Sequence, residues 1–410
     1  MLTAIDCGRP DNVPLSFMIF QALRGRSDGW RDFVERSIEL GVDPVVNLAA
    51  SAPSDGQEHP DAPGTPLSYA RGVTVREWRE RPPGARYPLL HKEYVTASGT
   101  LSVAVNRTDD WPYGDHVPFL NDYIEPRAVK HLVTSPEDLS ALRELLAEPT
   151  AEDLAEYRAA WKGAKEFAER KQLLTTTGWG VGADALAWIF GLTNAVMAAV
   201  DRPDFLDELL DVIFQWNRRR MEILLEPEPD LFIRRGWYEG TSFWSPALFQ
   251  RFLLPHLRSE AKLVHEAGSR FGYIMTVGAN QFAQPLLESG VDVVIGVDDV
   301  QDHGIGFTEL KQKLRGRIAL WGGSTASSPS RKAARTTSER RPPPRSKRSD
   351  PTASCSHPWT ISAALRKPSG ERSSPSSTSG STPREKPSAR AGSRPIRSWK
   401  RTAAGSGQPA

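Results

Sequence analysis

The sequence predicts an α/β protein, a (β/α)8 TIM barrel that is incomplete at its C-terminal end and follows an N-terminal extension with a β-hairpin. Strand-like and helix-like patterns alternate from about residue 150 to residue 323, as in a parallel sheet covered by helices. Polar, glycine-rich and aromatic residues follow the apolar run of each strand. A doubly wound sheet gives the same alternation, but residues of this kind at every strand end favour a barrel with its site on the C-terminal face.

The N-terminal extension covers residues 1–135 and contains one clear hairpin pattern, KEYVTASGTLSVAVNRT. Two runs of strand-forming residues flank Ser98 and Gly99, a pair that readily turns the chain. An aromatic and acidic loop follows. A helix is then expected to begin where Ser135 supplies the N-cap and Pro136 the first helical residue.

The barrel region, residues 136–323, contains five strand patterns with the loops that follow them. They are LLTTTGWG, DLFIRRGWYEG, RFGYIMTVG, VDVVIGVDD and IALWGG. The expected helices cover 183–190, the run with Phe205, Leu209, Ile213 and Trp216, the run from Ser245 to Gly268, 280–289, and 307–314. The stretch WGVGAD lacks the full dinucleotide-binding spacing, so its glycines indicate a tight turn between a strand and a helix.

The composition is typical of a soluble globular enzyme, since 39% of the 410 residues are hydrophobic and 25% are charged. From Ser324 onward there are 18 Lys and Arg against 4 Asp and Glu, which leaves 34 against 46 before it. An acidic body therefore precedes a basic tail. Two cysteines are too few for a disulfide framework or a Cys-rich metal site. The N-terminus lacks the basic start of a signal peptide, and no apolar run reaches the length of a membrane span, so we expect a cytoplasmic protein without a membrane partner.

Five stretches between about residue 90 and residue 323 stand in an order that is more specific than any one of them. They are EYVTASGTL, TDDWPYGDHVPF, WYEGTSFWSPALFQRFLLPHL, the block from EAG through YIMTVGAN to LLESGVDVVIGVDD, and LKQKLRGRIALWGG. In this order they resemble the uroporphyrinogen decarboxylase (URO-D) superfamily, which includes the decarboxylase and the corrinoid-linked methyltransferases. The resemblance implies a (β/α)8 barrel with substrate bound at the C-terminal ends of the strands.

The two branches of this superfamily differ in their motifs. The decarboxylases carry an Arg-rich N-terminal loop of the type RQAGRY, which holds the acidic side chains of the tetrapyrrole. Here QALRGRSDGW offers Arg24 and Arg26 in a different setting, which weakens the decarboxylase interpretation. The methyltransferases hold a thiol through zinc at a His-x-Cys pair. Met275 and Val277 occupy those two positions here, and since neither residue is a good zinc ligand, no metal is expected.

Two residues at the predicted mouth are candidates for catalysis. Glu239 stands where the methyltransferase-like members carry an acidic residue, and a carboxylate in an aromatic pocket can be tuned as a proton donor or acceptor. The alternative for Glu239 is a simple ion pair with Arg235. His303 follows a strand in a Gly-rich loop beside the predicted cleft, where it is either catalytic or merely exposed.

The remaining candidates would bind substrate. They are Trp179, Arg235, Trp237, Asp298 and Asp299. Arg234 and Arg235 are adjacent on a strand, so only one of them faces the barrel interior. Arg235 lies nearer the strand end and is the better candidate for contact with a substrate carboxylate, the alternative being an ion pair with a helix. An aromatic run suits a flat, partly apolar ligand, or equally the packing of a barrel rim or a dimer interface; its members are Trp237, Tyr238, Phe243 and Trp244.

The tail, residues 324–410, is dominated by Ser, Arg, Pro, Thr and Ala, a composition that predicts disorder. A basic arm for nucleic acid or membrane is one interpretation. A one-base frameshift near Gly323 explains more, because SDPTASCSHPWTISAA, with its codons shifted, is compatible with GPDGFVLSPVDNIRG, which looks like the last strand and loop of the superfamily. In that frame the single codon of Trp359 forces an Asp at Thr360. Because a frameshift would account for the basic tail, the charge of the tail does not indicate a nucleic-acid partner.

The hypotheses for function follow from these observations. The first is methyl transfer that involves a corrinoid or a methylated small molecule, without zinc and with no tightly bound cofactor; a corrinoid would be a substrate or belong to a partner protein. The second is uroporphyrinogen decarboxylation, with a tetrapyrrole-type substrate and no cofactor. The third is a non-catalytic binding protein or a decayed family member. A small-molecule substrate and a homodimer are compatible with all of them.

Overall fold

The computed structural model describes residues 1–17, 20–48, 72–146, 151–297 and 307–322 of the chain. The chain divides into two units, residues 1–364 and residues 365–410, and every helix and strand named below belongs to the first unit. The tail and its suspected frameshift lie outside the described residues.

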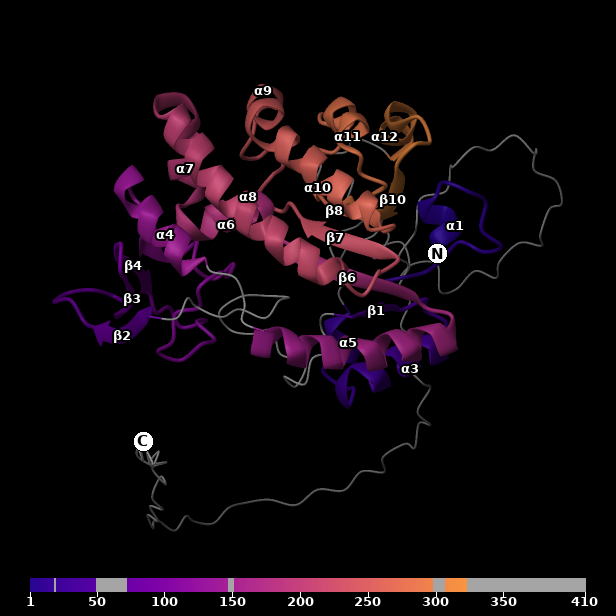
Figure 1. The fold of residues 1–410 in the computed structure, drawn as a ribbon, viewed down its shortest axis with the longest axis horizontal. Coiled ribbons are helices and arrows are strands. Elements are labelled where there is room, and N and C mark those ends of the chain that lie inside the picture. The colour runs from indigo at the N-terminus through magenta and orange to yellow at the C-terminus, as the bar shows by residue number, and fades with distance from the viewer. Residues whose placement is uncertain (18–19, 49–71, 147–150, 298–306, 323–410) are drawn as a thin grey trace, which may run out of the picture. The chain divides into compact units, whose positions relative to one another are not determined.

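A parallel sheet of six strands forms the centre of this unit. In spatial order the strands are β1 (Val45–Asn47), β6 (Leu174–Gly180), β7 (Leu231–Arg235), β8 (Arg270–Ile274), β9 (Val293–Val297) and β10 (Ala319–Gly322). Each strand is parallel to its neighbours. The sheet curls into a half-barrel with β1 and β10 at its two ends (Figure 1). The predicted parallel α/β architecture is confirmed, but within the described ranges the large sheet has six strands and does not close into an eight-stranded barrel.

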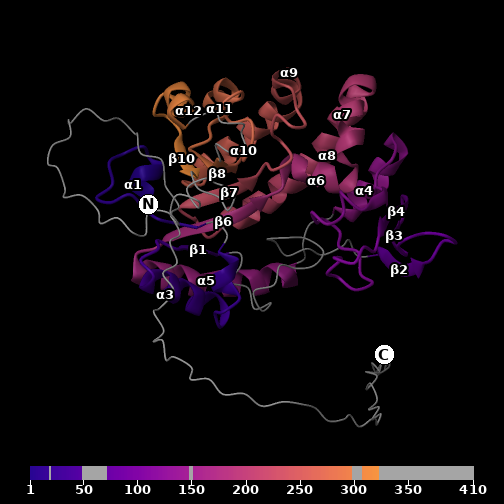
Figure 2. The same cartoon turned by 180° about the vertical axis from the view of Figure 1, so that it is seen from behind.

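Helices connect and cover the strands. They are α1 (Leu2–Ile5), α2 (Gln21–Arg24), α3 (Gly29–Glu39), the 3-10 turn η2 (Pro136–Asp138), α4 (Leu139–Leu145), α5 (Ala151–Lys171), α6 (Gly182–Ile189), α7 (Leu192–Asp201), α8 (Pro203–Leu225), α9 (Pro246–Leu248), the π-helical segment η3 (Phe249–Leu253), α10 (Leu254–Glu266), α11 (Ala283–Ser289) and α12 (Phe307–Leu314). Figures 1 and 2 show α8, α10, α11 and α12 along one side of the sheet, with α3 and α5 beside β1.

Two helix starts follow the predicted capping chemistry. Ser135 and Asp138 form a reciprocal capping box with Pro136 between them, although the first turn is 3-10 and α4 begins after it. The Ser245 side chain accepts a hydrogen bond from the backbone N of Leu248 at 3.3 Å. The helical run that begins there continues through the π-helical segment to the end of α10, close to the predicted end at Gly268. The two starts are confirmed.

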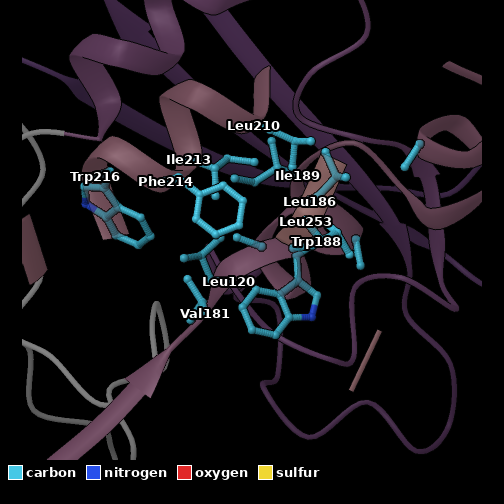
Figure 3. Packing of buried hydrophobic residues seen from close by; sticks show 14 of the residues in the cluster. Leu120, Val181, Leu186, Trp188, Ile189, Leu210, Ile213, Phe214, Trp216 and Leu253 are labelled. Atoms are coloured by element: carbon cyan, nitrogen blue, oxygen red, sulfur yellow. The ribbon is translucent and has the colours of Figure 1, made fainter. Parts of the chain in front are cut away.

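Side chains alternate between the two faces of the large sheet. The inner face of the half-barrel is filled by a small cluster, namely Ile5, Leu174, Leu231, Ile233, Ile274, Val293, Ile295, Ala319 and Trp321. The opposite face, with Phe232, Phe271, Tyr273 and Val294, joins the larger cluster under the helices. Figure 3 shows part of that larger cluster, where Leu186 and Trp188 of α6 meet Ile213 and Phe214 of α8. Helix α1 adds Ile5 to the inner cluster, and Asp6 pairs with Arg270 at 2.8 Å.

A smaller antiparallel sheet precedes α4. Its order is β2 (Thr74–Glu80), β3 (Leu89–Thr96), β4 (Gly99–Asn106) and β5 (Ala128–Lys130). The predicted hairpin is confirmed as β3–β4, but the pairing of Thr96 with Gly99 places Ala97 and Ser98 in the turn, one residue earlier than predicted. Buried residues of this sheet, such as Leu90 and Leu101, belong to the same cluster as the helices of the half-barrel.

Among the helices of the described ranges, none is by itself long and apolar enough to cross a bilayer. Helices α6 and α7 reach that length and composition only together, across a bend of 101°.

Candidate functional site

Strand β7 ends in two adjacent arginines that leave the sheet on opposite faces. Leu231 and Ile233 belong to the inner cluster, so Arg235, which follows them at the same spacing, faces the inside of the half-barrel. Phe232 packs under the helices, and Arg234 points the same way. Both side chains are buried, with exposed fractions of 0% and 4%. The predicted opposite orientation is confirmed, and each buried charge has its own acidic partners, as such charges require.

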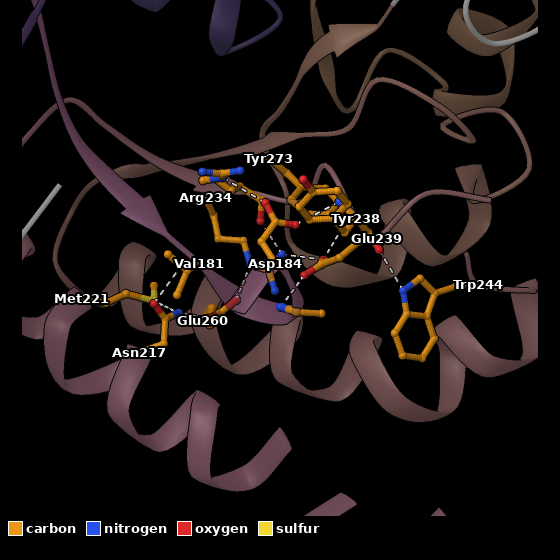
Figure 4. Close-up of polar contacts among 12 residues, drawn as sticks. Val181, Asp184, Asn217, Met221, Arg234, Tyr238, Glu239, Trp244, Glu260 and Tyr273 are labelled. Carbon is orange, nitrogen blue, oxygen red and sulfur yellow. Dashed lines mark hydrogen bonds and ion pairs between the residues drawn. The ribbon is translucent and has the colours of Figure 1, made fainter. Parts of the chain in front are cut away.

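The outer arginine, Arg234, is held by two carboxylates. Its Nε donates to Glu260 Oε2 on α10 at 2.9 Å, and its Nη1 forms an ion pair with Glu239 Oε2. Glu260 Oε1 accepts from Asn217 Nδ2 of α8 at 2.5 Å. Asn217 Oδ1 in turn accepts from the backbone N of Val181 at 3.0 Å. This outer network, drawn in Figure 4, ties β7 to the start of α6, to α8 and to α10.

Glu239 has both carboxylate oxygens engaged within the outer network. Oε1 accepts from the backbone N of Ala183 in the first turn of α6 at 2.8 Å, and Oε2 accepts from the Tyr273 hydroxyl at 2.5 Å as well as pairing with Arg234. A carboxylate at a helix N-terminus also neutralises the helix dipole. The alternative pairing predicted for Glu239, with Arg235, is wrong: its partner is Arg234. Glu239 lies beside Arg234 on the helix-covered face, and its side chain is therefore 0% exposed.

Gly182 of WGVGAD makes room for this network, and Gly178, just before that stretch, makes room for the backbone of β7. A Cβ on Gly182 would lie 1.9 Å from Arg234 Nη2, and Gly182 has φ +43°. A Cβ on Gly178 would lie 2.2 Å from the backbone O of Ile233. The predicted tight turn between strand and helix is confirmed, since β6 ends at Gly180 and α6 begins at Gly182.

Burial and charge fix the protonation of the outer network. Burial works against the Arg234 charge, but the Glu239 and Glu260 carboxylates outweigh it and raise the pKa of Arg234. Burial, reinforced by the Glu239 charge, raises the pKa of Tyr273 well above its ordinary value. Tyr273 therefore stays a neutral donor to Glu239 at physiological pH.

The inner arginine, Arg235, lies between two other carboxylates and two indole rings. Its Nε donates to Asp184 Oδ2 of α6 at 2.9 Å, and its Nη2 donates to both oxygens of Asp122 at 3.0 and 3.1 Å. The guanidinium carbon lies 4.1 Å from the ring centroid of Trp237 and 4.8 Å from that of Trp188. These five residues and Tyr238 form a polar and aromatic group named the inner cluster site, which is distinct from the apolar inner cluster that contains Leu231 and Ile233.

Asp122 is the exposed member of the inner cluster site. Its Oδ1 accepts from the Tyr238 hydroxyl at 3.0 Å and from Trp188 Nε1 at 3.1 Å, in addition to Arg235. Its side chain is 39% exposed, while that of Arg235 is 4% exposed. Burial, followed by the Asp122 charge, raises the pKa of Tyr238, which keeps this hydroxyl protonated. Three donors thus converge on one carboxylate that solvent can reach.

Asp184 is the buried acid of the inner cluster site. Burial raises its pKa to about 6, against the opposing effect of Arg235 and with a further increase from Glu239. Its Oδ1 accepts from the backbone N of Tyr238 at 2.9 Å, and its Oδ2 accepts from Arg235. Asp184 therefore joins α6 to the loop after β7, and its charge changes near neutral pH.

The structure brings together only some of the residues predicted for the site. Arg235 and Trp237 are adjacent in the inner cluster site, while Glu239 lies in the outer network. Trp179 is in β6, but its side chain lies outside the described part of the chain. Asp298, Asp299 and His303 also lie outside the described residues.

Sequence reasoning missed Asp122, Asp184 and Trp188, whereas Tyr238 belongs to the aromatic run predicted at Trp237. Asp184 closes the WGVGAD stretch, which was interpreted only as a turn, and Asp122 lies in the aromatic and acidic loop before Ser135. An acidic residue directly after a Gly-rich strand end was the one local signal available for Asp184.

Met275 and Val277, which stand where the methyltransferases carry their zinc ligands, both lie within the described residues. Met275 is fully buried in the helix-covered cluster, and the backbone O of Val277 would lie 2.4 Å from a Cβ on Gly240. Within the described ranges, no three His, Cys, Asp or Glu side chains are placed to hold a metal ion. The expectation of zinc-free chemistry stays a prediction.

No family model and no curated protein matches the sequence. Among solved structures, a methyltransferase from Methanosarcina mazei is similar over 80% of this chain and 82% of its own, with 14% identity and a TM-score of 0.44. A dipeptide epimerase from Enterococcus faecalis V583 is similar over 64% of this chain and 83% of its own, with 12% identity and a TM-score of 0.17. Similarities at these TM-scores establish neither the fold nor the activity of this chain.

Proposed function

We propose that this protein is a zinc-independent enzyme of the URO-D type that transfers a methyl group between a small carboxylate-bearing molecule and a corrinoid. The inner cluster site is the observation that carries the proposal. It places Arg235 on the inner face of the half-barrel at the carboxyl end of β7, where enzymes with parallel barrel strands have their sites. The ordered resemblance of residues 90–323 to the superfamily supports it from the sequence.

The donors of the inner cluster site suit a substrate carboxylate. Arg235 Nη2, Tyr238 Oη and Trp188 Nε1 all donate to Asp122. Charge-assisted hydrogen bonds to a carboxylate are among the stronger polar contacts in proteins. A substrate carboxylate that replaces Asp122 would meet the same three donors. Asp184 would meanwhile hold Arg235 in place from the buried side, as a positioning residue.

The reaction needs no activated thiol. An electron pair on the reduced corrinoid cobalt attacks the methyl carbon, the bond from that carbon to its heteroatom breaks, and a cobalt–carbon bond forms. The heteroatom keeps the bonding pair and takes a proton. His303 is the proposed proton donor, while Glu239, with both oxygens engaged by Ala183, Tyr273 and Arg234, is assigned a positioning role.

The charges of the inner cluster site make uroporphyrinogen decarboxylation the weaker of the two proposals. The tetrapyrrole carries carboxylates on each pyrrole ring, and its recognition calls for an excess of cations. Arg235 is already balanced by Asp184 and Asp122. Among the described residues of this site, one arginine faces two acids, which suits a substrate with a single carboxylate better.

The test uses the full chain under anaerobic conditions with reduced cobalamin and a panel of methyl ethers, thioethers and amines. Each donor is offered with and without a carboxylate, and the visible spectrum follows conversion of reduced cobalamin to methylcobalamin. The proposal expects methylcobalamin only with carboxylate-bearing donors, and loss of that reaction in Arg235→Met. Absence of methyl transfer in either direction, together with decarboxylation of added uroporphyrinogen, would establish the alternative.

A further inference from the structure

Strand β2 is an open edge of the antiparallel sheet. Among the described residues, β3 is its one neighbour in the sheet, and all seven residues from Thr74 to Glu80 are exposed. Figures 1 and 2 draw β2 at the outside of this sheet, beyond β3 and β4. An exposed strand edge is a template for pairing with a further strand. The side chains on the edge decide which strand it accepts.

The sequence TVREWRE is complementary to itself in one antiparallel register. When Trp78 lies opposite Trp78 of a second copy, Arg76 lies opposite Glu80, and Glu77 opposite Arg79. Each of these pairs occurs twice by symmetry, so every charge from 76 to 80 meets its opposite.

Neighbouring registers lack this property. A pairing centred on Glu77 or on Arg79 puts that residue opposite its own copy. Shifting the second copy by one residue from the Trp78-centred register puts Arg76 opposite Arg79 in one direction and Glu77 opposite Glu80 in the other. Like charges directly opposite each other are destabilising, so the Trp78-centred register is selected.

The rows across the sheet continue the same alternation. Arg76 pairs with Glu93 of β3, so the second copy's Glu80 would complete a row of alternating sign. Trp78 stacks on His91 with ring centroids 4.9 Å apart and is itself 45% exposed. Two such stacks would meet at the symmetry axis, and Pro82, which lacks a backbone N–H donor, would end the ladder on each side.

We propose that the partner of this edge is a second copy of this chain, bound through β2 about Trp78 as a two-fold symmetric dimer. The proposal does not depend on the methyl transfer proposed above. It has a structural consequence for that site, because the connection from β4 to β5 carries Asp122, and a sheet continued across two copies would hold this connection more firmly.

The experiment uses two charge reversals in the full chain and sedimentation velocity. In Arg76→Glu each new Glu meets Glu80 of the other copy, and in Glu80→Arg each new Arg meets Arg76. Either variant alone should weaken the dimer at least about tenfold. An equimolar mixture restores opposite charges in both pairs, and its heterodimer should form with an affinity within about threefold of the wild type.

The control is Lys130→Glu on β5, at the other end of the same sheet, which should leave the association unchanged. If one variant does not fold, the mixture fails to restore the dimer and the circular dichroism spectrum of that variant differs from that of the wild type. This outcome is thereby distinguished from a loss of pairing between folded chains. A wild type that stays monomeric up to about 100 µM overturns the proposal. So does a dimer that ignores both reversals, or well-folded variants whose mixture stays monomeric.

Discussion

Arg234 and Arg235 are neighbours in the chain, yet they serve two different regions of the molecule. Arg234 lies under the helices in a network whose carboxylates, Glu239 and Glu260, are both buried. Arg235 lies on the inner face, and one of its two acids, Asp122, is 39% exposed. A closed network of this kind has no exposed carboxylate to exchange and acts by holding the fold and its own residues in position, whereas an open one can exchange its exposed carboxylate for a ligand. The difference arises from the period of two residues along a strand.

The largest effect should come from breaking the closed network. Arg234→Met leaves Glu239 and Glu260 buried without their cation, which should lower the free energy of unfolding by about 3–5 kcal/mol. Urea denaturation followed by circular dichroism measures this loss. A loss of less than about 1 kcal/mol would show that the outer network does not hold β7 to the helices.

The next effect concerns the pH dependence given by Asp184. Its pKa is about 6 in the fold against an ordinary value of 3.8, because it is buried. Between these two values the folded chain keeps a proton that the unfolded chain has lost. The Asp184 contribution to stability should therefore fall as pH rises from about 4 to about 6 and stay constant above that.

The comparison of wild type with Asp184→Asn isolates this contribution. Their difference in unfolding free energy should change by at most about 3 kcal/mol between pH 4 and pH 7, in the direction that favours the variant at the higher pH. Denaturation curves at several pH values measure it. A difference that is flat over this range, or that changes in the opposite direction, would contradict a raised pKa for Asp184.

A smaller effect is expected where the backbone makes room for Arg234. Gly182→Ala adds a Cβ that would lie 1.9 Å from a guanidinium whose other nitrogens are held by Glu239 and Glu260. Gly268→Ala is the matched control, because Gly268 also has a positive φ but no atom within 4 Å of its added Cβ. The first variant should lose about 1–3 kcal/mol more than the second. Equal losses would mean that φ alone, not the guanidinium, requires the glycine.

The smallest effect on stability should come from the open end of the inner cluster site. Asp122→Asn removes a charge from an acid that is 39% exposed, so its cost should stay below about 1 kcal/mol. Thermal unfolding measures the cost, and Arg234→Met serves as the reference for a closed pair. A cost as large as that reference would mean that Asp122 is part of the structural core and not a replaceable carboxylate.

Local patterns predicted much of the fold. The β3–β4 hairpin and the helix starts at Ser135 and Ser245 depend on residues a few positions apart, so the sequence alone is sufficient for them. The alternation of strands and helices likewise predicted the parallel sheet, and the period of two predicted the opposite faces of Arg234 and Arg235.

Features that depend on distant contacts were not predictable in this way. Asp122 is 113 residues from Arg235 and Asp184 is 51 residues from it, so no local pattern connects them. Strand β2 was missed because its charged residues fall on both faces, and the apolar alternation of a half-buried strand is absent.

The central claim is that Arg235, and not Arg234, is the arginine that binds a ligand. The most direct test is calorimetric titration of the carboxylate-bearing methyl donor that reacts with cobalamin into the wild type and into Arg235→Met, at a pH where both are folded. The account predicts affinity at least about tenfold weaker in Arg235→Met, as expected for a lost charge-assisted pair. Equal affinity in the two proteins would contradict it.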